Sequence, residues 1–144
     1  MKTCSDVMTK DPICCLPGDT VEQVARLMKQ GDIGSVPVVE SHESGHLVGI
    51  VTDRDIRRIL GPDFSHSSPE TLIVGDAMVE EAYVVDLNTP LAVVLHHMAD
   101  HHFGSALVTR KGKLAGVFTS TDACRAFAAH LDTHFHPPGE DAAA

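Results

Sequence analysis

Aromatic residues are scarce in this 144-residue chain, which has no Trp, one Tyr and five Phe. Aromatic rings supply the faces on which single-stranded nucleic acids stack, and few such faces are available here. Basic residues are also in the minority, because 11 Lys and Arg stand against 20 Asp and Glu, for a formal net charge of −9. A phosphate backbone is held mainly by clustered Lys and Arg. The sequence therefore predicts a protein that does not bind nucleic acid.

Long apolar runs and paired cysteine motifs are missing as well. No segment reaches the roughly 18 apolar residues that a membrane helix needs, and the first residues lack the apolar stretch of a signal peptide. The four cysteines, Cys4, Cys14, Cys15 and Cys124, form no C-x-x-C pair. We therefore expect a soluble, cytoplasmic protein without membrane contact, whose cysteines are reduced thiols.

An internal repeat dominates what is present. A shift of 70 residues superimposes Met8 on Met78, and beyond residues 40–45 a shift of 67 superimposes Gly49 on Gly116. Each half has only about 65 residues, so packing the two halves together buries a far better core than either alone. We predict one integrated domain with pseudo-two-fold symmetry. Its expected parts are repeat 1 at 1–62, a linker at 63–75, repeat 2 at 76–134 and a disordered tail at 135–144.

Hydrophobic periodicity predicts the order β-α-β-β-α in each repeat, which is a mixed α/β (α+β) fold. In the first repeat, Thr20 can cap a helix with Gln23 three residues on, and Val21, Val24 and Met28 share one face of that helix. The expected helices are a turn at 5–8, then 21–31, 55–60, one that follows a Thr89 cap with Pro90 at its first position, and 122–131. The expected strands are 13–16, 35–39, 47–51, 83–85, 106–109 and 114–118.

A strand-to-helix junction recurs in the two repeats. Residues 49–55, Gly-Ile-Val-Thr-Asp-Arg-Asp, correspond to residues 116–122, Gly-Val-Phe-Thr-Ser-Thr-Asp. At such a junction the first backbone N–H groups have no partner within the helix and the helix end carries partial positive charge, so a phosphate can bind. Thr52 and Thr119 add a hydroxyl at the same place. The junction is therefore a candidate anion site in both repeats.

A carboxylate follows each hydroxyl by three residues, at Asp55 and Asp122. An ionised carboxylate only accepts hydrogen bonds, and it can accept them from both the 2′ and the 3′ hydroxyl of a ribose. Phosphate beside a ribose reader indicates a nucleotide. The alternative is structural, since Thr-x-x-Asp is also a capping box that only starts a helix. A cap alone has no need of the preceding glycine, and two matching copies favour the nucleotide site.

These residues resemble a tandem pair of cystathionine β-synthase (CBS) domains, also called a Bateman module. The resemblance runs from about Cys4 to His130 and rests on motifs that match in order. It leaves no part of the chain for an appended enzyme or DNA-binding domain. The matching motifs are Val7-Met8-Thr9, the helix ending in Leu27-Met28, Gly34-Ser35-Val36-Pro37-Val38 and the junction at 49–55.

The resemblance implies a regulatory module that binds an adenosine-containing ligand, namely AMP, ADP, ATP, S-adenosylmethionine or a dinucleotide such as NAD. It implies a homodimer, formed through helices into a flat disc of four repeats, that signals to an effector protein of unknown identity. Phosphate would meet Thr52 and Thr119, and ribose would meet Asp55 and Asp122. The base would lie in an apolar slot lined by Ile13 and Cys14 with Val36 and Pro37 in one repeat, and by Tyr83 and Val84 with Ser105, Ala106 and Leu107 in the other.

The two copies of the junction are unequal. Arg54 lies inside the first copy, where the second has Thr121, and Arg57 and Arg58 follow within five positions. Arg125 is the basic residue near the second copy. We therefore expect polyphosphate to bind more tightly at the first junction, and Arg54→Ala to weaken ATP binding.

Other candidate chemistry is less well supported. No set of nucleophile, base and acid emerges, so we do not expect an enzyme. The adjacent Cys14 and Cys15 of a strand would point to opposite faces, and one could line the slot. Two alternatives remain: a structural dimerisation protein with empty sites, and an interaction protein that responds to metal or to thiol oxidation. In the metal-responsive alternative, the ligands would come from two histidine clusters. One consists of His96, His97, His101 and His102 with Asp100, and the other of His130, His134 and His136.

Overall fold

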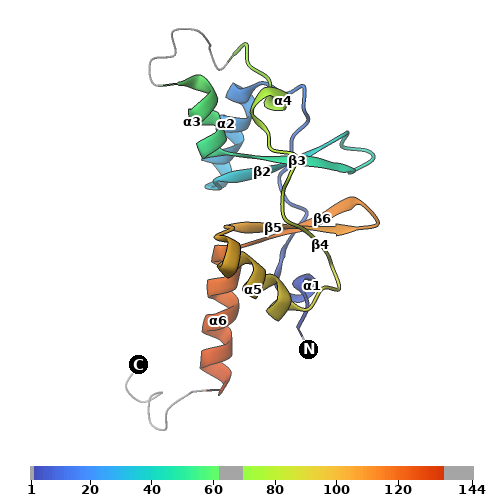
Figure 1. Ribbon diagram of the computed structural model, residues 1–144, viewed down its shortest axis with the longest axis vertical. Coiled ribbons are helices and arrows are strands. Elements are labelled where there is room, and N and C mark those ends of the chain that lie inside the picture. Colours follow the sequence, from blue (N-terminus) through green and yellow to red (C-terminus); the bar gives the residue numbers. More distant parts are fainter. Residues whose placement is uncertain (1, 62–69, 135–144) are drawn as a thin grey trace.

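Two similar halves are stacked on each other in the computed structural model, which describes residues 2–61 and 70–134 (Figure 1). The predicted mixed fold of helices and strands is confirmed. The first half contains α2 (Val21–Gly31), β2 (Ser35–Val39), β3 (Leu47–Thr52) and α3 (Asp53–Leu60). The second half contains β4 (Val84–Asp86), α5 (Leu91–His101), β5 (Ser105–Arg110), β6 (Lys113–Thr119) and α6 (Ser120–His134).

Local sequence explains where the helices start and stop. Thr20 accepts a hydrogen bond from the Gln23 backbone, and the Gln23 side chain accepts one from the Thr20 backbone, which completes the predicted capping box of α2. The helix includes Gly31 and ends at Asp32, whose φ of 51° is left-handed. In α5, Pro90 is the capping residue rather than the first helical residue, because the helix begins at Leu91. Among the described residues, no helix has the length and apolar character to cross a bilayer.

Each half has a sheet of the same pattern. In the second half the strand order is β1 (Thr9–Lys10), β6, β5, β4, with β4 parallel to β5 and the other pairs antiparallel. In the first half the hairpin β2–β3 is flanked by single bridges only, from Val79 to Ile50 and from Cys15 to Val38. The strand predicted at 13–16 was therefore wrong, since it is reduced to the one bridge at Cys15.

The chain segments that open the repeats are exchanged between the halves. The first leader, residues 3–10, holds α1 (Cys4–Val7) and β1, and it packs on the second half (Figure 1). Cys4 is fully buried there, and its backbone N–H donates to the Thr89 carbonyl at 3.3 Å. The second leader, residues 73–79, holds α4 (Val74–Ala77) and packs on the first half. Val74 is fully buried there, and its N–H donates to the Asp19 carbonyl at 2.8 Å.

The recurring glycines are explained by these leaders. A Cβ at Gly116 would lie 2.7 Å from the Thr9 carbonyl oxygen, and a Cβ at Gly49 would lie 2.7 Å from the Val79 carbonyl oxygen. Real Cβ atoms do not approach oxygen so closely. The leader strands can cross the sheets only because these positions carry no side chain. The sequence pattern favours a link between these glycines and ligand binding, whereas in the fold they are needed to admit the leaders.

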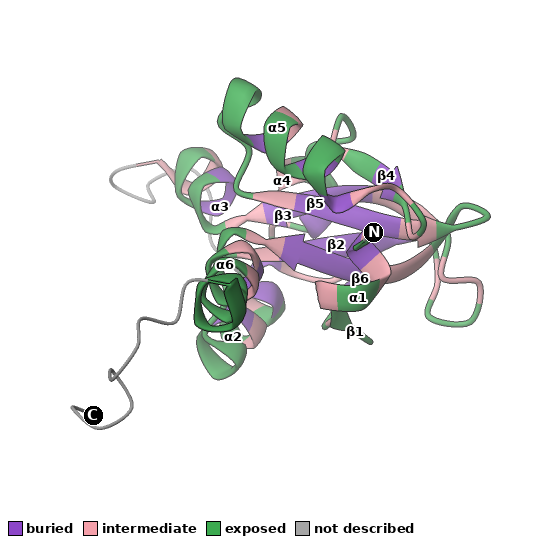
Figure 2. Ribbon diagram, turned by 90° about the horizontal axis from the view of Figure 1, so that it is seen from below, coloured by how far each residue is buried: buried purple, intermediate pink, exposed green. Residues whose placement is uncertain are grey.

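Apolar residues fill three clusters. One lies within each half, between sheet and helices, and a third joins the halves through Ile50, Leu107 and Val117. Figure 2 shows the buried residues concentrated on the strands while the helices expose their outer faces. The two β-hairpin sheets therefore face each other across the middle of the molecule, and the third cluster packs between them (Figure 1).

Repeat boundaries stay a prediction. The tail at 135–144 and residues 63–69 of the linker lie outside the described residues. The rest of the predicted linker includes the start of α4 at Val74. Because the leaders are exchanged, each compact half is assembled from two separate stretches of sequence.

Candidate functional site

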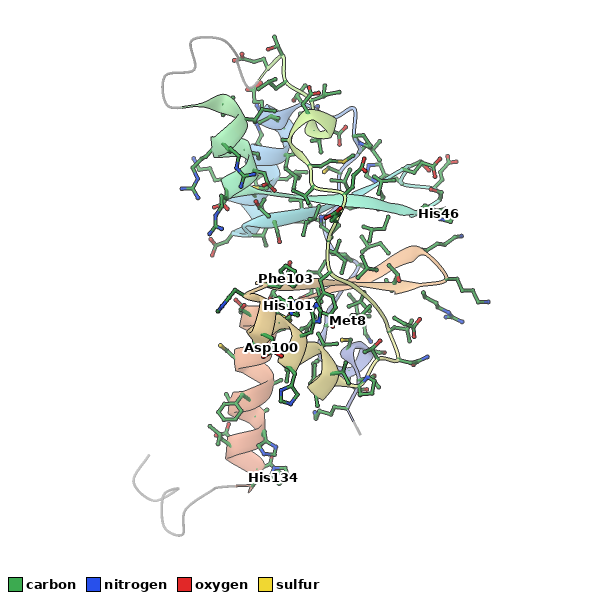
Figure 3. All side chains as sticks on the ribbon, in the orientation of Figure 1. Met8, His46, Asp100, His101, Phe103 and His134 are labelled. Atoms are coloured by element: carbon green, nitrogen blue, oxygen red, sulfur yellow. The ribbon has the colours of Figure 1, made fainter. Side chains whose placement is uncertain are left out.

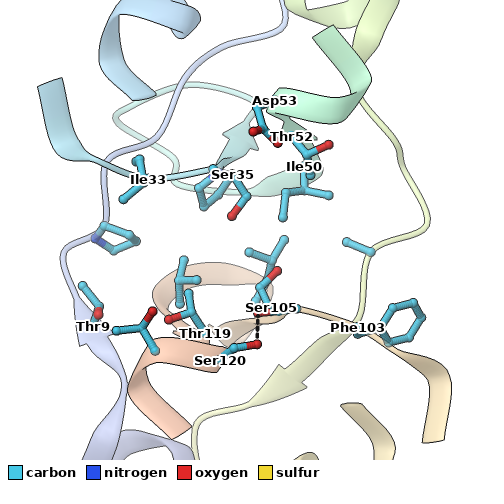
Figure 4. Close-up of a pocket in the computed structure, with 18 of the residues that line it drawn as sticks. Thr9, Ile33, Ser35, Ile50, Thr52, Asp53, Phe103, Ser105, Thr119 and Ser120 are labelled. Atoms are coloured by element: carbon cyan, nitrogen blue, oxygen red, sulfur yellow. Dashed lines mark hydrogen bonds between the residues drawn. The ribbon is translucent and has the colours of Figure 1, made fainter. Parts of the chain in front are cut away.

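A cleft of about 1020 Å³ lies between the halves and is lined by both (Figure 4). The two predicted junctions open onto it from opposite sides. Figure 4 shows Thr52 and Ile50 on one wall facing Thr119 and Ser105 on the other. The volume lies at the upper end of the range for small-molecule sites, roughly 300–1,000 Å³. One cavity thus contains both candidate half-sites.

Both junctions form complete capping boxes. The Thr52 hydroxyl accepts from the Asp55 N–H at 3.1 Å, and Asp55 Oδ2 accepts from the N–H and the hydroxyl of Thr52 at 3.0 and 2.8 Å. In the second half, Thr119 and Asp122 make the same three contacts at 3.3, 2.9 and 3.2 Å. Thr52 and Asp55, and likewise Thr119 and Asp122, therefore do cap their helices, as the structural alternative predicts. These contacts leave the second oxygen, Oδ1, of each carboxylate for other partners.

Both carboxylates are buried, with 8% of Asp55 and 5% of Asp122 exposed. An arginine one turn later lies near each Oδ1 atom: Arg58 at 3.9 Å from Asp55 and Arg125 at 3.6 Å from Asp122. Both arginine side chains are more than 70% exposed, so these ion pairs contribute little to stability. Positive charge at the cleft mouth instead suits an anionic ligand.

The three clustered arginines of the first half have different surroundings. Arg54 and Arg58 line the cleft, whereas Arg57 pairs with Asp53 at 3.4 Å and does not line it. Arg54 forms no ion pair with the described residues. Arg54 is therefore available to a phosphate group. Arg57→Ala is the matched control for Arg54→Ala in a nucleotide-binding measurement, because Arg57 does not line the cleft.

The predicted slot residues divide into two groups. Ile13, Pro37, Tyr83 and Ser105 line the cleft. Val36, Val84 and Ala106 do not, and two of them, Val36 and Ala106, are fully buried in the cores of their halves. Strand alternation explains the difference, since neighbouring residues of β2 and β5 point to opposite faces. The same rule brings Leu107 to the cleft.

Several further lining residues were not predicted, among them Thr9, Ile33 and Phe103. Thr9 arrives with the exchanged leader, and no local pattern announces that placement. Ile33 and Phe103 follow the left-handed residues that end α2 and α5, at equivalent positions of the two repeats. Their equivalence was visible in the repeat alignment and could have drawn attention to them.

Aromatic and imidazole rings gather beside the second half-site. The His97 ring stacks between Tyr83 and His101, with centroids 4.0 and 4.1 Å away, and the Phe103 ring lies 5.9 Å from Tyr83. Figure 3 shows Phe103 and His101 close together at this end of α5. Burial is the main cause that raises the pKa of Tyr83, and the charge of an ionised Cys4 raises this pKa further. Two of the six aromatic residues of the chain, Tyr83 and Phe103, thus line the cleft at this half-site.

The two histidine clusters proposed as metal ligands lie along the surfaces of α5 and α6. His97 and His101 are stacked on α5, and His130 and His134 are stacked on α6, 4.1 Å apart. His134 lies toward the far end of α6 in Figure 3, and His136 is outside the described residues. Within residues 2–61 and 70–134, no three His, Cys, Asp or Glu side chains are arranged to hold a metal ion.

Cys14 and Cys15 lie on opposite sides of the chain, but neither lines the cleft. Cys15 is fully buried, and burial, with smaller contributions from Asp19 and Cys14, raises its pKa to about 12. Cys14 faces a separate groove, where its sulfur is 3.7 Å from Nδ1 of His42. The expectation that one of them lines the slot is wrong. Any effect of thiol oxidation on the cleft would have to be indirect.

Known proteins resemble the chain over most of its length. It is 37% identical to the uncharacterized protein YlbB of Bacillus subtilis over 123 residues, which cover 85% of this chain and 80% of that protein. A structure of CBSX2 in complex with AMP has a TM-score of 0.76 and 25% identity over 90% of this chain and 98% of that one.

Another solved structure, Hypoxic Response Protein I with two coordinated zinc ions, has a TM-score of 0.72 and 27% identity, and covers 86% of this chain and 98% of that one. Hypoxic response protein 1 of Mycobacterium tuberculosis is 28% identical over 93% of this chain and 88% of that protein. The family model for the CBS domain matches residues 4–62 and 74–129, which include both junctions and all but the first residue of each leader. The chain therefore belongs to the CBS domain family and carries a pair of these domains.

Proposed function

We propose that this protein is a regulatory sensor that binds an adenosine-containing nucleotide in the cleft between its two halves. The candidate ligands are AMP, ADP, ATP, S-adenosylmethionine and NAD. The observation that carries the proposal is the pair of buried carboxylates, Asp55 and Asp122, which face one cleft from two helix starts. Thr52 and Thr119 lie beside them for the phosphate. The AMP complex of the related CBSX2 supports an adenosine ligand.

The parts of the ligand have matching surroundings. The carboxylates accept from ribose hydroxyls, the helix starts and Arg54 favour phosphate, and Ile13, Pro37 and Tyr83 offer apolar surface to the base. Nothing in this arrangement supplies a positioned nucleophile with a base, so the proposed role is binding and not catalysis. Ligand binding changes the output by favouring one arrangement of a homodimer, to the extent that the ligand binds that arrangement more tightly.

A thermal-shift panel tests the proposal. AMP, ADP, ATP, S-adenosylmethionine, NAD and zinc are each added at millimolar concentration to the wild type and to the Asp55→Ala/Asp122→Ala variant. A ligand at a hundred times its Kd adds about 2.7 kcal/mol of stability, which corresponds to a rise in Tm of roughly 5–10 °C. We expect at least one nucleotide to produce this rise in the wild type and none in the variant.

Gln23→Ala is the matched control. Gln23 completes the capping box of α2 but does not line the cleft, so this variant loses a cap without touching the site. We expect its Tm to fall while the rise on adding ligand persists. No rise with any nucleotide would instead favour the structural dimerisation protein with empty sites, and a rise with zinc alone would favour a metal-responsive one.

A further inference from the structure

The exchanged leaders place different side chains at equivalent positions of the two half-sites. Thr9 of the first leader pairs with Val117 on β6, and Val79 of the second leader is bridged to Ile50 on β3. The repeat alignment makes Thr9 equivalent to Val79, and Val117 equivalent to Ile50. Both leader residues line the cleft. A hydroxyl therefore faces the second half-site where a methyl group faces the first.

The Thr9 hydroxyl engages the carboxylate of its half-site. It donates to Oδ1 of Asp122 at 3.2 Å and lies 3.4 Å from Oδ2. Oδ2 already accepts two bonds from Thr119, so both oxygens of Asp122 have hydrogen-bond partners. In the first half-site, the bonds from Thr52 go to Oδ2 of Asp55. Among the described residues, Oδ1 of Asp55 has only the long ion pair with Arg58.

We propose that Thr9 and Val79 decide which half-site binds a ribonucleotide tightly. The Asp55 half-site takes it first, because Oδ1 of Asp55 is open to the ribose hydroxyls. At the Asp122 half-site, the ribose has to displace the Thr9 hydroxyl, so this half-site binds more weakly. The inference rests on the proposed function, because it concerns the affinity of the same cleft for the same class of ligand.

Other equivalent positions also distinguish the half-sites. Arg54 in the first corresponds to Thr121 in the second, which gives the first an additional cation for the phosphate. The slot pair Ile13 and Ile33 corresponds to Tyr83 and Phe103. These differences affect phosphate and base, whereas Thr9 acts on the carboxylate that reads the ribose. The role of Thr9 can therefore be tested by exchanging two leader residues and leaving the rest of the cleft unchanged.

Calorimetric titration with AMP on the full chain is the experiment, and Asp55→Ala and Asp122→Ala assign each binding event to its half-site. In the wild type, we expect Asp55→Ala to remove the tighter event and Asp122→Ala to leave it. Thr9→Val should tighten the weaker event about tenfold, since a hydrogen bond to a charged group is worth that much or more. Val79→Thr should weaken the tighter event by a similar factor.

Thr9→Ser is the matched control, because it keeps the hydroxyl and should keep the wild-type affinities. If Thr9→Val lowers the melting temperature strongly, Thr9→Ala provides a second variant without the hydroxyl. The proposal is overturned if Asp122→Ala, and not Asp55→Ala, removes the tighter event, or if removing the Thr9 hydroxyl leaves the weaker Kd within a factor of two. AMP binding would then still support the proposed function, which fails separately if no nucleotide binds to any variant.

Discussion

Single residues decide how closely the leaders approach the sheets, and Gly116 is the clearest case. Its Cα lies under the first leader, so that a Cβ would meet the Met8 sulfur at 2.6 Å and the Thr9 carbonyl oxygen at 2.7 Å. The sulfur is the end of a flexible side chain and can move. The carbonyl belongs to β1, which is hydrogen-bonded to β6, so it can move only if the leader shifts. This position therefore couples the packing of the leader to the strand that ends at Thr119.

Gly116→Ala should lower the free energy of unfolding by about 1–3 kcal/mol, the usual cost of forcing an extra methyl group into a packed site. The measurement is urea denaturation followed by circular dichroism. Gly18→Ala is the control, because a Cβ at Gly18 would meet no atom within 4 Å. Equal stability of the two variants would show that the leader yields without cost.

Cys15 gives the protein a specific sensitivity to alkali. Its thiol is fully buried, and its pKa is raised from 9.0 to about 12. Between these values the unfolded chain loses the thiol proton and the folded chain keeps it, so the free energy of unfolding falls as pH rises. The slope for one group is at most about 1.4 kcal/mol per pH unit. Below pH 9 the contribution is fully present.

The test compares urea denaturation of wild type and Cys15→Ala from pH 8 to pH 10.5. The wild type should lose about 2 kcal/mol more than the variant over this range. Cys124→Ala, at an exposed position, should follow the wild type. Parallel curves for wild type and Cys15→Ala would contradict the expectation.

At the scale of elements, the sequence predicts what local patterns determine. The capping box at Thr20, the apolar faces of α2 and α5 and the two hairpins are found within a few residues of their expected bounds. The predicted helices 55–60 and 122–131 are longer in the structure, starting at Asp53 and Ser120, because the capping threonine lies immediately before each.

The exchange of the leaders could not be predicted in this way. Residues 4–8 and 74–78 share the pattern of a short turn followed by Met, so either one fits the pattern expected at either sheet. The choice is made by contacts far apart in sequence, such as Cys4 with Thr89 and Val74 with Asp19. For the same reason the carboxylates and their threonines were predictable, whereas the Thr9 contact to Asp122 was not.

Because the leaders are exchanged, we predict that neither half folds without the other. If a protease site is inserted at residue 65 and the chain is cut there, the two fragments should remain together on gel filtration with native circular dichroism. Each fragment purified in denaturant and refolded alone should stay unfolded, because it lacks the leader that completes its core. Mixing them should restore the fold. Two fragments that fold separately and elute apart would show that the exchange is dispensable.

The whole molecule has an exposed extension. All residues of α6 from Phe127 to His134 are exposed, and the helix projects beyond the second half (Figure 1). Phe127 and Leu131 are 61% and 40% exposed and lie four residues apart, on one face of the helix. An exposed helix end is marginal in water, and an exposed apolar stripe is a typical contact surface. A partner that covers this face would stabilise the extension, and the proposed homodimer supplies one.

We therefore expect a mass near twice 15.4 kDa by light scattering of the wild type. Phe127→Asp with Leu131→Asp should give the mass of a single chain, because two buried carboxylates cannot be desolvated without partners. Ala129→Asp adds charge on the opposite side of the helix and should leave the dimer intact. Since Phe127 and Leu131 are both exposed in the single chain, the melting temperature of the monomeric variant, measured at low concentration, should match that of dissociated wild type. If the double variant keeps the dimer mass, α6 does not form the dimer interface. If the wild type has the mass of one chain, a signal cannot be transmitted through dimer geometry. Any nucleotide response would then have to act through the cleft between the two halves of a single chain.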